Sequence, residues 1–186
     1  MRVISGISRG RSLKAVPGIG TRPTSDKVKE AMFSMIGPFF DGGLVLDLFA
    51  GTGGLGIEAL SRGMERAIFV DLEKASVAVI RENLQKTGLA EKAEVYQNDA
   101  IRALKVLAKR DMCFGLVLLD PPYRMKNVEH LLQLLQEKRL LQSGATILVE
   151  HESAYCYAET VGCCRLRKHV VYGDTAVTIF EFREVL

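Results

Sequence analysis

The 186-residue sequence lacks the patterns that define several specialised classes of protein. It has no run of 18 apolar residues, and no apolar segment near its N-terminus is followed by a small-residue cleavage site. Internal repeats and low-complexity segments are also absent. We therefore expect a globular, cytoplasmic protein that acts as a monomer and does not bind a membrane.

Cysteines in a C-x-x-C pair are absent as well. Cys163 and Cys164 are adjacent, which is a poor framework for disulfides. Cys156, His151 and His169 lie nearby in the sequence, but the spacing of this group matches no known pattern of zinc ligands. We expect reduced cysteines and no metal, and the residues alone assign no role to this group.

Basic residues are concentrated at one end of the chain. The net charge is +3, yet residues 1–29 hold seven basic residues and one acidic residue, whereas the rest holds 18 basic and 21 acidic residues. A basic arm on a mildly acidic body predicts a polyanionic partner. A solvated basic terminus without a partner is the alternative.

From residue 44 onward, apolar runs typical of strands alternate with segments of helical periodicity. This alternation predicts an α/β fold with a mostly parallel, doubly wound sheet of seven strands. Only Gly173 and Asp174 separate the last two runs, which predicts a type II′ hairpin and an antiparallel edge. The expected strands are 44–50, 66–72, 93–99, 114–120, 145–152, 164–172 and 175–182, and the expected helices are 54–63, 74–88, 100–110 and 128–141.

The N-terminal part precedes this alternation. Residues 1–22 predict a small hairpin with Arg9 and Arg11 near its tip, and residues 24–37 predict a helix capped by Thr24 or Ser25. We treat residues 1–40 as an extension packed on a catalytic domain of residues 41–186.

A glycine-rich loop, "DLFAGTGGLG" (47–56), follows the first expected strand and opens the next helix. Gly51, Gly53 and Gly56 satisfy G-x-G-x-x-G, and Asp71 lies 20 residues after Gly51. Such a loop lets the backbone approach a ligand closely, while the acid binds ribose hydroxyls. The pattern fits a nicotinamide cofactor and S-adenosylmethionine (SAM) equally well.

Asp47 distinguishes between these two cofactors. At about 5 Å and an effective dielectric near 20, its carboxylate would repel each unit charge of a pyrophosphate by roughly 3 kcal/mol. SAM instead carries an ammonium and a sulfonium, which a carboxylate attracts. Residues 47–61 also contain no Lys or Arg that could neutralise a phosphate. The pattern therefore favours SAM.

Polar residues also end the second and third strands, where ligands of open α/β sheets bind. We expect Asp71 to accept hydrogen bonds from the ribose, and Asn98 and Asp99 to reach the adenine. Acids here can equally cap the following helix, and for Asp99 this alternative is the most serious. The residues expected to bind the cofactor are Asp47, Phe49, Ala50, Gly51, Thr52, Gly53, Gly56, Asp71, Leu72, Asn98, Asp99 and Ala100.

The fourth strand ends in Asp120-Pro121-Pro122-Tyr123. Two prolines stop ladder hydrogen bonding and hold the backbone extended. If the acceptor is an exocyclic amine of a nucleobase, the Asp120 carboxylate and the Pro121 carbonyl can accept its protons and aim the nitrogen lone pair at a methyl group.

Tyr123 offers a face on which the unstacked base can lie, a contact worth roughly 1–3 kcal/mol. Catalysis would then rest on orientation and electrostatics, without a metal or a covalent intermediate. A proline-stiffened loop with Tyr123 in the core is the structural alternative.

With both motifs present, the sequence resembles the SAM-dependent amino-methyltransferases. More closely, it resembles the bacterial small-subunit ribosomal RNA guanine-N2 methyltransferases of the RsmD type. The stretches that carry the resemblance are "RVISGISRGRSL", "TRPTSDKVKEAMFSMI", "DLFAGTGGLGIEALSRG", "LLDPPY" and "YGDTAVTIFEF". The two N-terminal stretches are the more specific part, because DNA adenine-N6 methyltransferases share the glycine loop and Asp-Pro-Pro-Tyr.

The resemblance implies a Rossmann-like class I methyltransferase fold. It also implies methyl transfer from SAM to N2 of a guanine in small-subunit rRNA, a site of the guanine 966 type, with S-adenosylhomocysteine as product. The substrate would be an assembled or partly assembled small ribosomal subunit. Lys29 stands where Arg is more usual in the family. The residues implied to contact RNA are Arg9, Arg11, Arg22, Lys27 and Lys29.

Three other functions stay open from the residues. A DNA adenine-N6 methyltransferase fits Asp-Pro-Pro-Tyr equally well, although the chain leaves little room for a separate DNA-reading domain. A nicotinamide-dependent oxidoreductase fits the glycines but is opposed by Asp47. A non-catalytic RNA-binding module would not need intact acids at three strand ends.

Overall fold

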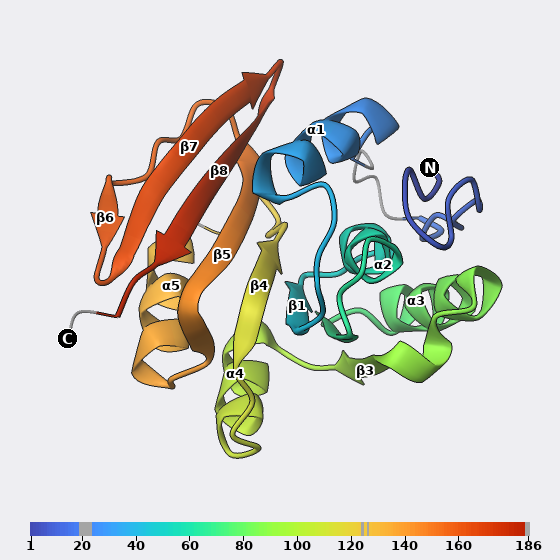
Figure 1. The fold of residues 1–186 in the computed structure, drawn as a ribbon, viewed down its shortest axis with the longest axis horizontal. Coiled ribbons are helices and arrows are strands. Elements are labelled where there is room, and N and C mark those ends of the chain that lie inside the picture. The colour runs from blue at the N-terminus through green and yellow to red at the C-terminus, as the bar shows by residue number, and fades with distance from the viewer. Residues whose placement is uncertain (19–23, 124, 126, 185–186) are drawn as a thin grey trace.

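One eight-stranded sheet forms the centre of the protein, in the order β3-β2-β1-β4-β5-β8-β7-β6 (Figure 1). The computed structural model describes residues 1–18, 24–123, 125 and 127–184. The strands are β1 (Leu44–Leu48), β2 (Arg66–Asp71), β3 (Ala93–Gln97), β4 (Phe114–Leu119), β5 (Leu141–Glu152), β6 (Thr160–Val161), β7 (Cys164–Tyr172) and β8 (Thr175–Phe182). The helices are α1 (Asp26–Ile36), α2 (Gly54–Ser61), α3 (Lys74–Thr87), the short 3₁₀ helix η1 (Ala90–Lys92), α4 (Ala100–Ala108) and α5 (Val128–Glu137).

The predicted topology is confirmed. Strands β3, β2, β1, β4 and β5 are parallel, and β8, β7 and β6 add antiparallel partners to the β5 edge. The two-residue β6 is an eighth strand beyond the seven that the sequence predicts. Among the central residues of the β7–β8 turn, Gly173 has a positive φ (64°) and Asp174 does not, as a type II′ turn requires.

The largest boundary differences from the sequence prediction lie where α5 is followed by β5. Helix α5 ends at Glu137 rather than at residue 141, because Arg139 adopts a left-handed φ of 54° that cannot continue a helix. Leu140 is buried, and Leu141 already begins β5. The leucines after the turn therefore fill the core from a strand rather than from a helix.

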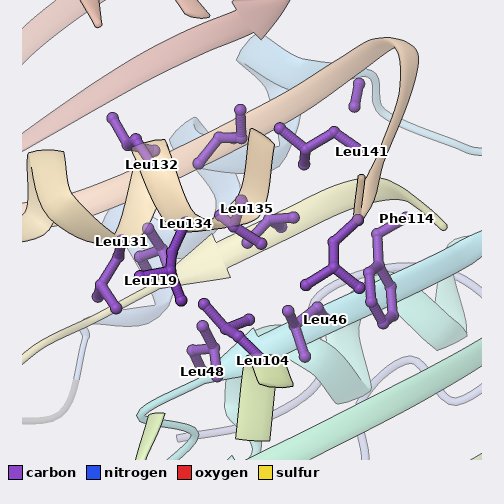
Figure 2. Close-up of a cluster of buried hydrophobic side chains, with 14 of the residues drawn as sticks. Leu46, Leu48, Leu104, Phe114, Leu119, Leu131, Leu132, Leu134, Leu135 and Leu141 are labelled. Carbon is purple, nitrogen blue, oxygen red and sulfur yellow. The ribbon is translucent and has the colours of Figure 1, made fainter. Parts of the chain in front are cut away.

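Helices cover both faces of the sheet. Side chains alternate along each strand, so Leu46 and Leu48 of β1 face α4 and α5, whereas Val45 faces α1, α2 and α3. The leucine stripe of α5 packs onto the first of these faces, as expected for a helix that covers a sheet (Figure 2). Both clusters are continuous, so the sheet holds the strand ends in a fixed register.

The N-terminal hairpin (residues 1–13) is tighter and less regular than predicted. A single antiparallel bridge joins Arg2 to Ser12, and the Val3 N–H donates to the Arg11 carbonyl over 2.9 Å. Ser25 precedes helix α1, and its Oγ accepts a hydrogen bond from the Val28 N–H. Ser25 rather than Thr24 is thus the cap.

A buried carboxylate, that of Glu58 in α2, joins this hairpin to the helices. It accepts hydrogen bonds from the N–H groups of Ile4 (2.9 Å) and Ser5 (3.0 Å). It also pairs with Arg62 Nε at 2.7 Å and with Lys29 Nζ at 3.3 Å. Because neither Glu58 nor Lys29 has exposed side-chain surface, water cannot replace these contacts.

Lys29 does not reach the surface. Its Nζ donates to the Arg2 carbonyl over 2.6 Å, and burial lowers the pKa of Lys29 while Glu58 opposes that shift. The expectation that Lys29 contacts RNA is therefore wrong, because its ammonium group is buried and binds the Glu58 carboxylate and the Arg2 carbonyl.

Replacing Glu58 by Ala should lower the free energy of unfolding by about 3–5 kcal/mol, because Lys29 and Arg62 would keep buried charges without their carboxylate. Urea denaturation followed by circular dichroism measures this change. Glu30→Ala, at an exposed position of α1, is the control and should stay within about 0.5 kcal/mol of the parent. A decrease of less than about 1 kcal/mol for Glu58→Ala would contradict the proposed importance of this network.

Candidate active site

The loop after β1 adopts an unusual backbone. Phe49 has a φ of 61°, although non-glycine residues rarely adopt such values, and Gly51 and Gly53 have φ values of 56° and 77°. Strained backbone of this kind concentrates at functional sites, where the surrounding structure holds it. The loop thus presents its backbone at the carboxyl end of β1.

Gly56 lets α2 pack closely on the sheet. A Cβ atom there would lie 2.3 Å from the Phe69 ring and 2.9 Å from Asp47 Oδ2. The Gly56 N–H donates to that same oxygen over 2.9 Å. The third glycine of the motif is therefore required for helix–strand packing, and it places an N–H of the first turn of α2 against Asp47.

Asp47 is buried beneath the loop. Burial raises the pKa of its carboxyl well above the usual range; the Gly56 N–H opposes the rise, and the Asp71 charge adds to it. The preference for SAM over a nicotinamide cofactor requires an ionised Asp47. A cationic ligand would favour that ionised form, so the preference for a cation over a phosphate remains.

Asp71, at the end of β2, supports the loop. Its Oδ2 accepts from the Gly51 N–H over 2.8 Å, and its Oδ1 accepts from the Glu73 N–H over 2.9 Å. Each carboxylate oxygen has a second lone pair that can accept from a ligand hydroxyl. The next residue, Leu72, has 62% of its surface exposed. An apolar side chain thus lies beside the polar side chain of Asp71.

Asp99, at the end of β3, caps the following helix, as the alternative interpretation of the sequence predicted. Its Oδ1 accepts from the Arg102 N–H over 3.1 Å at the start of α4, and Asn98 Oδ1 accepts from the Asp99 N–H over 2.9 Å. Both side chains are thus engaged by local backbone, which fixes their position at the strand end.

A cavity of about 390 Å³ lies beside this strand end. Its wall combines the start of α4 with the segment after β4 and the start of α5. Apolar side chains predominate among the lining residues, and three of the residues are polar, a composition suited to a flat heterocycle. The lining residues are Asp99, Ala100, Ile101, Pro122, Met125, Asn127, His130 and Leu131.

Asn83 of α3 connects the glycine loop to the N-terminal segment. Its Nδ2 donates to the Thr52 carbonyl (2.9 Å) and to the Lys14 carbonyl (3.1 Å), and its Oδ1 accepts from the Lys14 N–H (2.8 Å). Asn83 is fully buried, so one side chain holds both segments together. No pattern in the sequence pointed to this role of Asn83.

Asp120 follows β4 directly, and its side chain is half-buried. Among the described residues its carboxylate has no hydrogen-bond partner. Burial raises the pKa of Asp120 well above its usual range, and the charges of Glu150 and Asp47 raise it further. Such a carboxylate is ready to accept hydrogen bonds from a ligand.

The aromatic residue of the motif lies on the surface. Tyr123 is 58% exposed, and its hydroxyl lies 3.3 Å from Thr175 Oγ1, whereas Pro121 is buried. The alternative that Tyr123 fills the core is therefore wrong. Its ring is available to a base.

Glu150 in β5 is a second carboxylate at this site, which the sequence analysis missed. Val149 pairs with Leu119, so Glu150 lies one residue past that pair on the strand beside Asp120. Thr24 Oγ1 donates to Glu150 Oε2 over 2.6 Å. Burial raises the pKa of Glu150, while the Thr24 hydroxyl lowers it. An acid inside the apolar run "ILVEHE" was the available signal.

The remaining candidate RNA contacts have different environments. Arg9, Arg11 and Lys27 are exposed, and Arg11 Nη1 donates to the Lys86 carbonyl over 2.6 Å. Arg22 lies outside the described residues. Three of the five predicted contacts are thus on the surface.

The cysteine and histidine group does not form a metal site within residues 1–18, 24–123, 125 and 127–184. All four cysteines are free thiols. His151 and His169 both contact Thr178 Oγ1, at 2.7 Å and 2.9 Å. Over the same residues, no helix is long and apolar enough to cross a membrane.

A parallel sheet with a glycine loop after β1, acids at successive strand ends and Asp-Pro-Pro-Tyr after β4 defines a Rossmann-like class I methyltransferase fold. The chain belongs to the family described as conserved hypothetical protein 95, whose model matches residues 1–181. The predicted resemblance to the RsmD type is confirmed by this match together with relatives named ribosomal RNA small subunit methyltransferase D.

Two curated relatives span almost the whole chain. The Bacillus subtilis protein YlbH is 51% identical over 183 residues, which is 98% of this chain and 100% of the relative. Ribosomal RNA small subunit methyltransferase D of Escherichia coli is 32% identical over 181 residues, which is 97% of this chain and 89% of the relative.

Solved structures share the fold. The Escherichia coli methyltransferase yhhF has a TM-score of 0.83 at 33% identity, with 98% of each chain covered. An RNA methyltransferase from Salinibacter ruber, in complex with S-adenosyl-L-homocysteine, has a TM-score of 0.67 at 20% identity and covers 89% of this chain and 96% of its own. The second likeness concerns the fold alone.

The buried acids give the unliganded protein a pH dependence. Because the pKa of Asp47 is raised, the folded state binds this proton more tightly than the unfolded state, so the free energy of unfolding should fall as pH rises above about 4. Each such group lowers the free energy of unfolding by at most about 1.4 kcal/mol per pH unit. The raised pKa values of Asp120 and Glu150 act in the same direction as that of Asp47.

Asp47→Asn keeps an oxygen for the Gly56 N–H and removes the titration. The stability difference, variant minus parent, should therefore grow as the pH rises above about 4, as measured by urea denaturation at several pH values. Asp41→Asn, at an exposed position, is the control. A difference that stays constant with pH would show that Asp47 is not protonated in the folded state.

Proposed function

We propose that this protein transfers a methyl group from SAM to the N2 amine of a guanine in small-subunit ribosomal RNA. The observation that carries the proposal is an unpartnered carboxylate, Asp120, beside an exposed Tyr123 at the strand end next to the glycine loop. Its rRNA methyltransferase relative supports the substrate class.

Each part of SAM has a counterpart in the site. Asp47 would attract the cationic methionine part, and the loop from Phe49 to Gly53 would lie against it. Asp71 would accept hydrogen bonds from the ribose hydroxyls. Leu72 and the cavity lined by Ala100 would enclose the adenine. When bound, SAM supplies an electrophilic methyl group and leaves as S-adenosylhomocysteine.

The chain's own residues orient the acceptor. The Asp120 carboxylate and the Pro121 carbonyl accept the two protons of the amine, which aims its lone pair at the methyl carbon. As the nitrogen becomes cationic, the negative charge of Asp120 stabilises it, and the same carboxylate takes the proton that leaves. Because the pKa of Asp120 is raised, its carboxylate, once ionised, binds a proton more tightly than that of an ordinary aspartate.

The basic N-terminal segment would hold the RNA. Arg9 and Arg11 are exposed on the hairpin, and Lys27 is exposed on α1. Contacts to phosphates position RNA without regard to sequence. The substrate would be an assembled or partly assembled small subunit, on which Tyr123 stacks the flipped base.

Labelled SAM tests the proposal directly. The purified protein is incubated with small subunits from cells that lack this gene, and the RNA is then digested to nucleosides. Label in N2-methylguanosine is the expected result. Label in N6-methyladenosine would overturn the choice of base, and the absence of SAM binding by calorimetry would overturn the cofactor.

Asp120→Ala should keep the affinity for SAM and reduce turnover by about 10²-fold or more, the scale of losing one positioned polar group. Asp120→Asn keeps one acceptor oxygen and should fall between the parent and Asp120→Ala. Calorimetry with SAM and single-turnover methylation measure the two effects. An equal loss of SAM binding would move Asp120 to the cofactor site.

The double variant Arg9→Ala/Arg11→Ala should weaken RNA binding. It should also reduce the slope of log K against log salt by about 0.7–0.9 for each phosphate that the protein no longer neutralises. Filter binding at several salt concentrations measures the slope. Lys105→Ala/Lys109→Ala removes two exposed charges at the end of α4, far from the hairpin, and serves as the control (Figure 1). An unchanged slope for the hairpin variant would leave the basic arm as solvated surface.

A further inference from the structure

Three carboxylates lie on one face of the sheet at neighbouring strand ends. Asp47 of β1 pairs in register with Leu118, and Asp120 follows two residues later on the same face. Leu118 pairs with Leu148, so Glu150 in β5 faces the same way as Asp120. The face is the one covered by α1 and α2.

Each of these two carboxylates has oxygen atoms that no described residue engages. Thr24 engages Glu150 Oε2, and among the described residues Glu150 Oε1 and the Asp120 carboxylate have no hydrogen-bond partner. These oxygens keep lone pairs that can accept hydrogen bonds from a ligand.

This arrangement is unfavourable in the free protein. Neighbouring strands lie about 4.8 Å apart, so the two carboxylates repel each other in surroundings that also penalise their charge. Burial and mutual repulsion raise the pKa of Asp120, and burial raises that of Glu150. A pair of this kind suits a ligand that offers two hydrogen-bond donors side by side.

We propose that Glu150 determines the choice of base, its Oε1 accepting the N1–H of the target guanine while Asp120 accepts an N2–H. The inference rests on the proposed function and deepens it. The Thr24 hydroxyl holds the Glu150 carboxylate in place from the start of α1, so the N-terminal extension contributes to base selection.

The chemistry of the two purines explains the selectivity. Guanine carries N1–H and N2–H donors next to each other on one edge, which two carboxylate oxygens can accept together. Adenine places the N1 lone pair beside its amine, so a carboxylate at the Glu150 position would face another acceptor. Leaving such a buried acceptor without a donor is costly, and sites built this way reject the wrong partner strongly.

A base analogue distinguishes recognition of the guanine N1–H from a general loss of activity in the variant. 2-Aminopurine keeps the N2 amine of guanine but has a lone pair at N1 in place of the N–H. RNA or reconstituted subunits carry either base at the position where the labelling experiment places N2-methylguanosine. Single-turnover rates are then compared for the parent protein, Glu150→Gln and Glu152→Gln, the last being an exposed control two residues away.

The parent should methylate guanine at least about 10²-fold faster than 2-aminopurine. In Glu150→Gln the ratio should shrink to within about 10-fold, because a carboxamide can turn its oxygen to N1–H or its N–H to the N1 lone pair. Glu152→Gln should keep the parent ratio. SAM affinity should stay the same in all three, since none of the changes touches the expected cofactor site.

Several outcomes would overturn the inference. A parent protein that methylates both bases equally does not recognise N1–H, and this result needs no variant. If Glu150→Gln slows both bases by the same factor, Glu150 has only a structural role. Label in N6-methyladenosine in the first experiment would instead overturn the proposed function itself, so the two failures are distinguishable.

Discussion

Four donors from three segments of the chain converge on the buried carboxylate of Glu58, and the site depends on that convergence. The hairpin contributes two N–H groups, α1 contributes Lys29, and the end of α2 contributes Arg62. Helix α2 begins at the glycine loop, so the same charge that anchors the basic hairpin also sets the position of the loop. The N-terminal extension is thereby part of the site's frame.

The site is built at the expense of stability. Asp47, Asp120 and Glu150 share one face of the sheet, and burial raises the pKa of each. When they are ionised in the free protein, these groups are poorly solvated and repel one another. A cation near Asp47 and two donors near Asp120 and Glu150 would relieve both costs, so the ligands stabilise the arrangement that binds them.

Much of this could be predicted from the sequence, because strand and helix periodicity, the glycines and Asp-Pro-Pro-Tyr are local patterns. Contacts between distant segments could not. In the sequence nothing distinguishes Lys29 from a surface lysine, because only the fold brings Glu58 beside it. Glu150 is likewise an acid within a predicted strand, and only the strand register places it next to Asp120. Asp99 fits two interpretations of the sequence, and in the structure it caps α4 and also lines the cavity beside the strand end.

Asn83 connects the two segments that are expected to bind SAM and RNA. Its carboxamide holds the Thr52 carbonyl in the glycine loop and the backbone of Lys14 beyond the hairpin. A ligand that shifts one of these segments therefore acts on the other through a single buried side chain. Any coupling of the two binding events through Asn83 must be reciprocal, because thermodynamic linkage makes each ligand change the other's affinity by the same factor.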